Sequence, residues 1–221
     1  MKQLFIVANW KSNKTSIQVQ EWFEKFALYK NQLTGKPQKT MVVCVPFTYL
    51  PLAKKFIEKY NLPVHLGAQD LSSFGEGAYT GAINSKQLGE YVGFTIIGHS
   101  ERRLCFHETD EEIVKKQRIA SESGIKTILC VQSAQTQVAE GAEIIAYEPV
   151  SAIGTGNPDT PENAASVAKN FLSKNIPFVL YGGSVTPENV KQFTAKDEIS
   201  GVLVGGASLD PETFFQIINN S

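Results

Sequence analysis

The sequence predicts an α/β protein, a single-domain (β/α)8 barrel that spans residues 1–221. Eight short apolar runs alternate with helical patterns along the chain, and this alternation is typical of α/β folds. Each run is continuously apolar, which predicts a strand of a parallel sheet that is covered on both faces. Polar residues or glycines follow nearly every run, and this favours a ring of loops around one site at one end of a barrel.

An open, doubly wound sheet is the alternative architecture for the same alternation. Such a sheet predicts a Gly-x-Gly-x-x-Gly turn after the first strand, but Asn9, Trp10 and Lys11 stand there instead. No linker and no shift in composition divides the chain. We therefore favour the closed barrel.

The predicted strands are apolar runs too short to be helices, each stopped by a polar residue, a proline or a glycine. Pro46 and Pro149 close two of them, because proline withholds the backbone donor that a continuing strand needs. In chain order the runs are residues 4–8, 41–45, 64–68, 94–97, 127–131, 144–147, 178–181 and 202–204.

Helix signals fill the connections between these strands. Thr109 and Glu112 form a capping box that opens a helix, and Gly124 ends it. Thr160 before Pro161 is an N-cap that starts another helix, to about residue 174. Residues 132–142 leave room for only a stub of helix. The other predicted helices are residues 16–32, residues 49–60, a short helix ending at 88–91, one that begins at Pro187 and one that ends near 218.

Composition excludes several classes of protein. With 21 basic and 22 acidic residues the net charge is −1, which argues against a nucleic-acid partner and against an acidic membrane surface. No apolar stretch approaches the roughly 18 residues that span a bilayer, and the N-terminus lacks the order of a signal peptide. Three cysteines without paired spacing predict a reduced, cytoplasmic protein, and we expect no metal site.

One stretch carries the strongest chemical signal. The sixth predicted strand delivers the carboxylate of Glu148 at its C-terminal end, and Pro149 stops the strand there. Ile153 follows between small residues, and Gly154, Thr155 and Gly156 can bring backbone amides close to an anion. A lone Glu-Pro is more often a salt-bridged residue beside an ordinary loop, so the other strand ends decide its meaning.

Two further strand ends complete a set of catalytic groups. Lys11 supplies a positive charge after the first strand, and His99 follows the fourth strand at the start of a helical turn, where the helix dipole favours neutral imidazole. Each residue alone is more often structural. In a closed barrel both face one mouth with Glu148, which gives a base, a neutral donor and a cation. This set suits proton abstraction beside a carbonyl, with the oxyanion stabilised by His99 and Lys11.

Glycine-rich turns follow the seventh and eighth strands. Backbone amides of such turns commonly hold a phosphate at the mouth of a barrel. Any one of these glycines is explained by packing alone, but three clusters at one rim favour an anion site.

These stretches together resemble the triosephosphate isomerase family over essentially the whole chain. The matching segments are Ala8-Asn9-Trp10-Lys11, Gly98-His99-Ser100-Glu101-Arg102-Arg103, residues 146–156, Tyr181-Gly182-Gly183-Ser184-Val185 and Leu203-Val204-Gly205-Gly206-Ala207-Ser208. The resemblance implies a TIM barrel that interconverts dihydroxyacetone phosphate and glyceraldehyde 3-phosphate through an enediolate, without a cofactor.

The resemblance also implies roles for single residues. Glu148 moves the carbon-bound proton, and His99 polarises the carbonyl. Lys11 and Asn9 assist at the oxyanion, and Glu101 supports the site. The amides of Gly154, Ser184, Gly205 and Gly206 hold the phosphate of the triose substrate. The implied lid comprises Pro149, Ser151, Ile153, Thr155 and Gly156, and Ile153 and Leu203 cover Glu148 when it closes.

The chain departs from the family pattern in three places. Ser151 stands where members carry a tryptophan, and Ser133 where they carry the glutamate that partners it. Asn157-Pro158-Asp159 replaces a small-residue hinge. The segment 132–142 is shortened, as in compact archaeal members, some of which are tetramers. These departures bear on the kinetics of the lid and on assembly.

Assembly and two rival functions remain to be weighed. Residues 72–84 are too long for a simple connection and match the family segment that enters a neighbouring subunit, so we expect a homodimer, with a tetramer as the alternative.

A different phosphosugar enzyme would need another acid–base pair beyond Glu148 and His99. A non-catalytic phosphate-binding barrel is expected to lose one of Lys11, His99 and Glu148, and all three are present.

Overall fold

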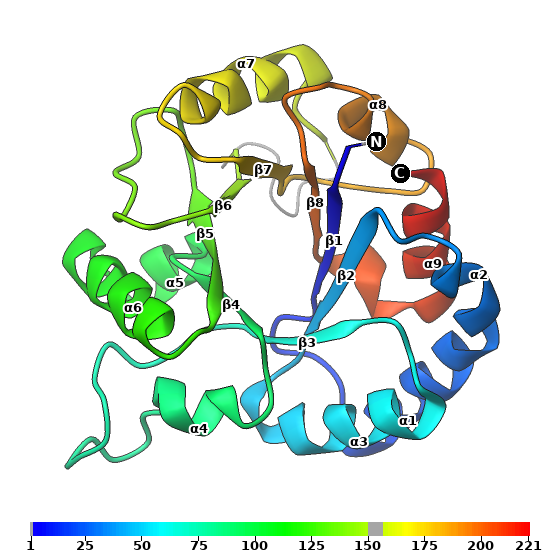
Figure 1. The fold of residues 1–221 in the computed structure, drawn as a ribbon, viewed down its shortest axis with the longest axis horizontal. Helices are drawn as coiled ribbons and strands as arrows, with labels where there is room; N and C mark the ends of the chain where they lie inside the picture. Colours follow the sequence, from blue (N-terminus) through cyan, green and yellow to red (C-terminus); the bar gives the residue numbers. More distant parts are fainter. Residues whose placement is uncertain (1, 150–156) are drawn as a thin grey trace.

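The protein forms a closed barrel of parallel strands in the order β1 to β8, with β8 paired to β1, which confirms the predicted architecture. The computed structural model describes residues 2–149 and 157–221. Figure 1 looks along the barrel, with the strands as an inner ring and the helices outside it. The strands are β1 (Leu4–Asn9), β2 (Lys39–Cys44), β3 (His65–Ala68), β4 (Phe94–Ile97), β5 (Lys126–Val131), β6 (Ile144–Tyr147), β7 (Phe178–Tyr181) and β8 (Gly201–Val204).

The strand predictions are confirmed, with differences only at the strand ends. β4, β6 and β7 have the predicted bounds, whereas β2 begins two residues earlier, at Lys39, and ends one residue earlier, at Cys44. Lys39 is buried although it is charged, because its ammonium donates to the backbone oxygens of Ile218 and Ser221 at the end of the chain.

Both faces of the strands are buried, as continuous apolarity predicts. Alternate residues such as Phe5, Val7 and Ala146 point into the barrel and form its inner core. Their neighbours, such as Ile6 and Ala8, point outward and pack under the helices in a larger outer core. Side chains of a strand alternate between its two faces, so the two cores follow directly from the period of two.

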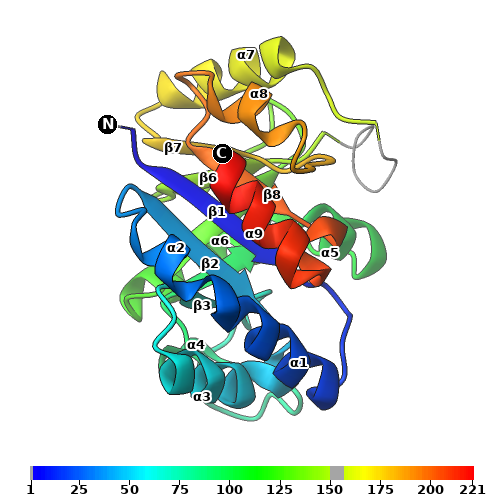
Figure 2. The same cartoon turned by 90° about the vertical axis from the view of Figure 1, so that its right-hand side faces the viewer.

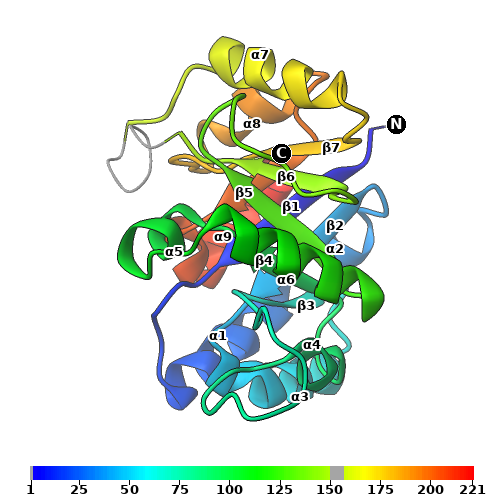
Figure 3. The same cartoon turned by 90° about the vertical axis from the view of Figure 1, so that its left-hand side faces the viewer.

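Helices cover most of the outside of the barrel (Figures 1, 2 and 3), the connection from β5 to β6 being a loop, and α6 packs against β4 and β5. The predicted caps of α6 at Thr109 and of α7 at Thr160 are present. The helices are α1 (Ser16–Phe26), α2 (Lys30–Thr34), α3 (Leu50–Tyr60), α4 (Ser85–Gly89), α5 (Ser100–Cys105), α6 (Asp110–Glu122), α7 (Pro161–Leu172), α8 (Val190–Thr194) and α9 (Pro211–Asn220). The described residues also form 3-10 turns: η1 (Ala27–Tyr29) joins α1 to α2, η2 (Phe47–Tyr49) precedes α3, and η3 (Gly206–Leu209) lies between β8 and α9.

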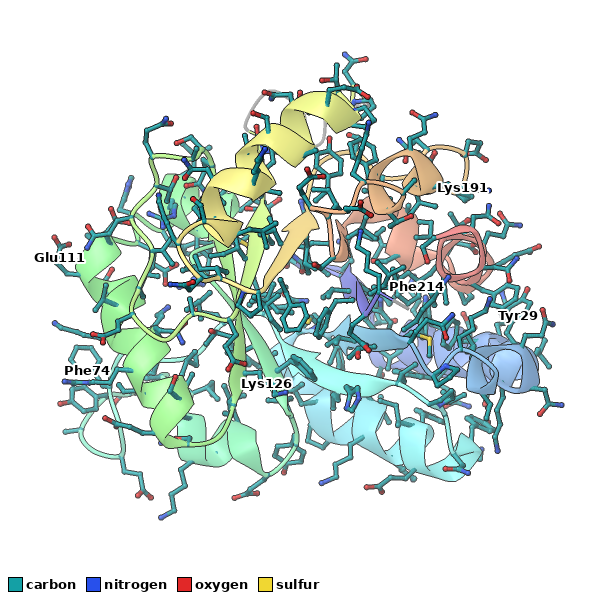
Figure 4. All side chains as sticks on the ribbon, turned by 45° about the horizontal axis from the view of Figure 1, so that its top comes forward. Tyr29, Phe74, Glu111, Lys126, Lys191 and Phe214 are labelled. Atoms are coloured by element: carbon teal, nitrogen blue, oxygen red, sulfur yellow. The ribbon has the colours of Figure 1, made fainter. Side chains whose placement is uncertain are left out.

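An aromatic cluster fixes α1 against the barrel. Trp22 stacks on Phe26, with ring centroids 4.6 Å apart, and meets Trp10 edge-on at 5.0 Å. Phe214 of α9 packs on the same two side chains of α1, and Figure 4 shows it turned toward the interior. The cluster therefore holds the segment that follows β1, next to the mouth of the barrel.

Two helix predictions need correction. The helix predicted to begin at Pro187 begins at Val190, because Asn189 accepts a hydrogen bond from the Thr186 amide at 2.8 Å and holds the intervening residues in a turn. The pattern over residues 16–32 is interrupted by η1, so it forms two helices, α1 and α2.

Residues 132–142 are short, as predicted, but form turns and no helix. The hydroxyl of Thr136 accepts the amides of Gln132 and Ser133, at 3.2 and 3.1 Å, and holds these residues in a turn. Across residues 2–149 and 157–221, none of the helices combines the length and apolarity needed to cross a membrane.

Candidate active site

Strand alternation brings the predicted site residues together at one end of the barrel. Val7, Ala146 and Leu203 belong to the inner side of the strands. Asn9, Glu148 and Gly205 each follow one of these residues by two positions, so they lie on the same side of the chain. Because parallel strands all end on the same rim, these three positions meet above the inner core.

Glu148 is almost fully buried, with 1% of its surface exposed, and both of its carboxylate oxygens have partners. The Ser100 amide donates to Oε2 at 3.0 Å, and Nε2 of His99 lies 2.9 Å from Oε1. Pro149 follows directly and is buried as well. A buried carboxylate needs such donors to satisfy its oxygens.

His99 is held as a neutral donor by its place in the fold. It is the N-cap of α5, and its Nδ1 accepts a hydrogen bond from the Glu101 amide at 3.2 Å. A backbone amide can only donate, so Nδ1 carries no proton and the ring proton lies on Nε2. His99 therefore presents an N–H toward Glu148 and the mouth of the barrel.

Lys11 and Glu101 form an ion pair across the mouth. The Nζ of Lys11 lies 2.6 Å from Oε1 of Glu101, and both side chains are partly exposed. Lys11 has φ 53°, a left-handed conformation, and its amide donates to the side chain of Asn9 at 3.0 Å. This local bond helps to hold the strained residue and directs its ammonium group toward the mouth.

A cavity of about 310 Å³ connects these groups with the glycine-rich turns. Asn9, Lys11, His99 and Glu148 line one side of it, and the turns after β7 and β8 line the other. The predicted phosphate-binding residues Ser184, Gly205 and Gly206 are all part of this lining, together with Gly182, Gly183, Val185, Thr186, Leu203 and Ala207. The cavity thus places a base, a neutral donor and a cation opposite a glycine-rich wall.

Three contacts of Glu148 were missed from the sequence. Besides the Ser100 amide, the thiol of Cys130 on β5 lies beside the carboxylate, and burial followed by the charge of Glu148 raises the pKa of that thiol well above its usual value. Gly182 is the third, because a Cβ there would come within 2.9 Å of Cγ of Glu148. Cys130 lies on β5 and Gly182 directly follows β7, the two strands that flank β6, so only the pairing of strands, and no single segment of sequence, could have revealed these contacts.

Asp159, the last residue of the Asn157-Pro158-Asp159 segment, is bonded to the ends of two strands. Its carboxylate accepts from the hydroxyl of Tyr147 at 3.2 Å, and its amide donates to the hydroxyl of Tyr181 at 2.8 Å. The two tyrosines are register partners on β6 and β7. Burial, followed by the charge of Asp159, raises the pKa of Tyr147 to about 12, and burial also raises that of Tyr181 to about 12.

The predicted lid residues Ser151, Ile153, Thr155 and Gly156 lie outside the described residues, as does the predicted phosphate-binding residue Gly154. Ser133, the predicted partner of Ser151, is described, and its hydroxyl accepts the Gln135 amide at 3.3 Å within the turn after β5. In the part of the chain that the structure describes, no three His, Cys, Asp or Glu side chains gather as metal ligands would.

Comparison with known proteins gives one consistent family. Residues 4–221 match the family model described as triosephosphate isomerase. A triosephosphate isomerase of Dictyoglomus turgidum is 38% identical over 255 residues, which cover 100% of both chains. The protein of the same name from Aquifex aeolicus is 40% identical and covers 96% of this chain and 97% of its own. That of Trichodesmium erythraeum is 36% identical and covers 99% of each.

Proposed function

The chain belongs to the triosephosphate isomerase family, and on that premise we propose that Glu148 is its catalytic base, His99 its neutral proton donor and Lys11 its oxyanion-stabilising cation. Members of the family interconvert dihydroxyacetone phosphate and glyceraldehyde 3-phosphate without a cofactor, and this is the reaction of the chain. The observation that carries the assignment of roles is the contact of Glu148 with His99 in a cavity that Lys11 also lines.

The arrangement supports a proton-transfer mechanism. The substrate carbonyl oxygen replaces the Glu148 carboxylate as the acceptor of the His99 Nε2–H, which frees Glu148 to take a proton from the adjacent carbon. The electron pair of that C–H bond moves to form the enediolate, whose oxygen is stabilised by His99 and Lys11. His99 gives its Nε2 proton to the former carbonyl oxygen and takes the hydroxyl proton from the neighbouring oxygen, which becomes the new carbonyl. Glu148 returns its proton to the neighbouring carbon. These are the roles already described for the glutamate and the histidine of this family.

The phosphate of the substrate lies against the opposite wall of the cavity in this proposal. Ser184, Gly205 and Gly206 line that wall, and their amides are the donors that suit a phosphate. Asn9 and Glu101 support the cation: Asn9 accepts the Lys11 amide, and Glu101 pairs with its ammonium group. Gly154 and the lid residues Pro149, Ser151, Ile153, Thr155 and Gly156 keep the roles that the family resemblance implies.

Replacing the base tests the assignment. We expect Glu148→Gln to lower kcat by about 10²–10⁴-fold, because the amide cannot accept the proton, while KM changes little. Coupled assays in both directions measure the loss. Glu143→Gln is the matched control, since Glu143 is an exposed glutamate just before the other end of the same strand and should leave kcat unchanged. Wild-type turnover in purified Glu148→Gln would refute the assignment.

We also propose that the protein forms a homodimer through residues 72–84. This segment extends away from the barrel between β3 and α4 in Figure 1, and Phe74 stands at the outer edge of the molecule in Figure 4. Phe74 and Tyr79 stack on each other with ring centroids 4.4 Å apart and are still 46% and 45% exposed. The stretch Gly77-Ala78-Tyr79-Thr80-Gly81 matches the family segment that enters a neighbouring subunit, and this resemblance implies that Thr80 lies near Asn9 and Lys11 of the partner subunit.

Sedimentation velocity tests this assembly at micromolar concentration and separates monomer, dimer and tetramer. Tyr79→Asp should convert the dimer to monomers and reduce activity, because it places a charge where the proposed interface is apolar. Leu28→Asp is the control, since Leu28 is 79% exposed on η1 and lies outside this segment. A fully active wild-type monomer would contradict the proposal.

A cytoplasmic location completes the proposal. It is supported by the glycolytic reaction of the family and by Cys44, Cys105 and Cys130, all of which are free thiols. The substrate is a small phosphorylated triose, and no nucleic-acid or membrane partner is proposed.

A further inference from the structure

The turn that follows β8 separates two cavities. Gly205, Gly206 and Ala207 line the cavity that holds the proposed active site. Leu209, at the end of the same turn, lines a second cavity of about 380 Å³ on the other side, together with Lys14, Trp22 and Lys25. The turn therefore has one face toward the substrate and a rear face toward α1 and the loop before it.

Lys14 reaches the rear face of this turn. Its Nζ donates to the backbone oxygen of Leu209 at 2.8 Å and lies 5.0 Å from the centroid of the Trp10 ring. A hydrogen bond from an ammonium group is stronger than one between neutral groups, and the aromatic ring adds a cation–π contact. Lys14 has φ 76°, a conformation that glycine adopts without strain and lysine does not. The contacts of Lys14 with Leu209 and Trp10 therefore offset the strain of its backbone conformation.

Two further bonds hold the same turn. The indole N–H of Trp22 donates to the backbone oxygen of Ser208 at 3.1 Å, and the hydroxyl of Ser208 donates to the backbone oxygen of Gly205 at 2.7 Å. Three successive anchors thus fix carbonyl groups at both ends of the turn. The carbonyl of Gly205 shares a peptide plane with the amide of Gly206, so its bond to Ser208 limits rotation of that amide, and the bonds to Ser208 and Leu209 hold the far end of the turn in place.

The loop after β1 contacts the turn from both sides. Cε of Lys11 lies 3.3 Å from the position that a Cβ on Gly205 would occupy, on the substrate side. Lys14, three residues later, bonds Leu209 on the rear side. One short loop therefore places the cation of the active site and supports the turn that lines the site.

We propose that Lys14 is a positioning residue that fixes the turn 205–209 for binding of the substrate phosphate. The inference rests on the proposed phosphate site and extends it to a residue that does not line the active-site cavity. Lys14 touches neither Glu148 nor His99 among the described contacts. Its removal therefore weakens the binding of phosphate groups and leaves the proton-transfer step intact.

The experiment compares Lys14→Met with the wild-type enzyme. We expect KM for dihydroxyacetone phosphate and the inhibition constant of inorganic phosphate to rise together by about 5- to 50-fold, with kcat within about threefold of wild type. Lys14→Arg should restore most of the loss, because its guanidinium can still donate to Leu209. Lys25→Met is the matched control, since it removes the same charge from the same cavity without a bond to the turn.

Lys14→Gly separates positioning from stability. Glycine relieves the left-handed strain at this position, so the melting temperature should hold or rise, while the inhibition constant of phosphate still increases as in Lys14→Met. This variant also keeps the test open if Lys14→Met folds poorly.

The possible failures point to different errors. Unchanged KM and phosphate inhibition in folded Lys14→Met or Lys14→Gly would overturn the role of Lys14. A loss confined to kcat would overturn it as well. A wild-type enzyme that inorganic phosphate does not inhibit would instead refute the proposed phosphate site, and the role of Lys14 with it.

Discussion

Glu148 fits beside Gly182 because the glycine has no Cβ. An added Cβ would lie 2.9 Å from Cγ of Glu148 and 3.2 Å from the backbone oxygen of Tyr147. The second of these atoms belongs to the backbone and cannot move aside easily. The space for the carboxylate therefore depends on a single missing methyl group on the neighbouring strand end.

We expect Gly182→Ala to lower kcat by about tenfold or more, because the new methyl group displaces Glu148 from its contacts with His99 and Ser100. Stability should fall by about 1–3 kcal/mol, the usual cost of overpacking. Steady-state kinetics and urea unfolding measure the two effects. Gly93→Ala is the control, since no atom lies within 4 Å of a Cβ built there. Unchanged kcat in Gly182→Ala would show that Glu148 has more room than the structure gives it.

The sequence predicted the site residues that can be recognised from their own segment. It missed the residues that contact the site only because neighbouring strands pack together. Glu148 and His99 could be recognised because a polar residue directly follows an apolar strand. Cys130 and Gly182 could not, since they reach Glu148 only through strand pairing, which sets Cys130 opposite Ala146 and Tyr147 opposite Tyr181. Register across a barrel is not a property of any one segment of sequence.

At the scale of elements, β6 and β7 are joined at their ends by Asp159. Its carboxylate bonds Tyr147, Asn163 and the amide of Thr160, and its own amide bonds Tyr181. The start of α7 is thereby connected to the strand end that carries Glu148. The bonds to Tyr147, Asn163 and Thr160 need the carboxylate of Asp159. The bond to the Tyr181 hydroxyl needs only the backbone amide of Asp159.

A double-mutant cycle can separate these two kinds of bond. Tyr147→Phe and Asp159→Ala should couple by about 0.5–2 kcal/mol in unfolding free energy, because each removes one partner of the same bond. Tyr181→Phe and Asp159→Ala should be closer to additive, because alanine keeps the amide that Tyr181 accepts. Urea unfolding of the single and double variants gives both values. Equal coupling in the two cycles would mean that the carboxylate has no specific bond to Tyr147.

The sequence predicted the helices that begin at a capping residue. It did not predict the turns that form where a side chain bonds the nearby backbone in place of a helix. The capping boxes of α1 and α6 are present in the structure, and the one at Thr109 was recognised from the sequence. By contrast, Asn189 and Thr136 bond nearby backbone groups and replace helix with turn after β7 and β5. Whether such a polar side chain turns toward the backbone or toward solvent depends on what packs around it.

At the scale of the whole molecule, two buried phenols limit stability at high pH. The pKa of Tyr147 and that of Tyr181 are raised from 10.0 to about 12, chiefly by burial. Below pH 10 both phenols are protonated in the folded and the unfolded chain, and their full contribution is present. Between pH 10 and about 12 the unfolded chain releases these protons while the folded chain keeps them, so the free energy of unfolding falls as pH rises.

We therefore expect a steep alkaline loss of stability in this window, measured as unfolding free energy in urea between about pH 9 and 11.5. Tyr147→Phe should give a shallower slope, because one of the late-titrating phenols is gone. Tyr91→Phe is the control, since Tyr91 is only partly buried and lies outside residues 72–84, so its removal should leave the slope unchanged. The same slope in all three proteins would contradict the assignment.

The pairing of β8 with β1 has a consequence for synthesis on the ribosome. β1 has neighbours on both sides only after Gly201–Val204 has emerged, because Phe5 pairs with Gly201 and Ala8 pairs with Val204. The active-site cavity needs the same two ends of the chain, since Lys11 and Gly205 both line it. A nascent chain stalled before its eighth strand should therefore be inactive and expose an open strand edge to chaperones, and catalysis should begin only once β8 and Gly205 have left the exit tunnel.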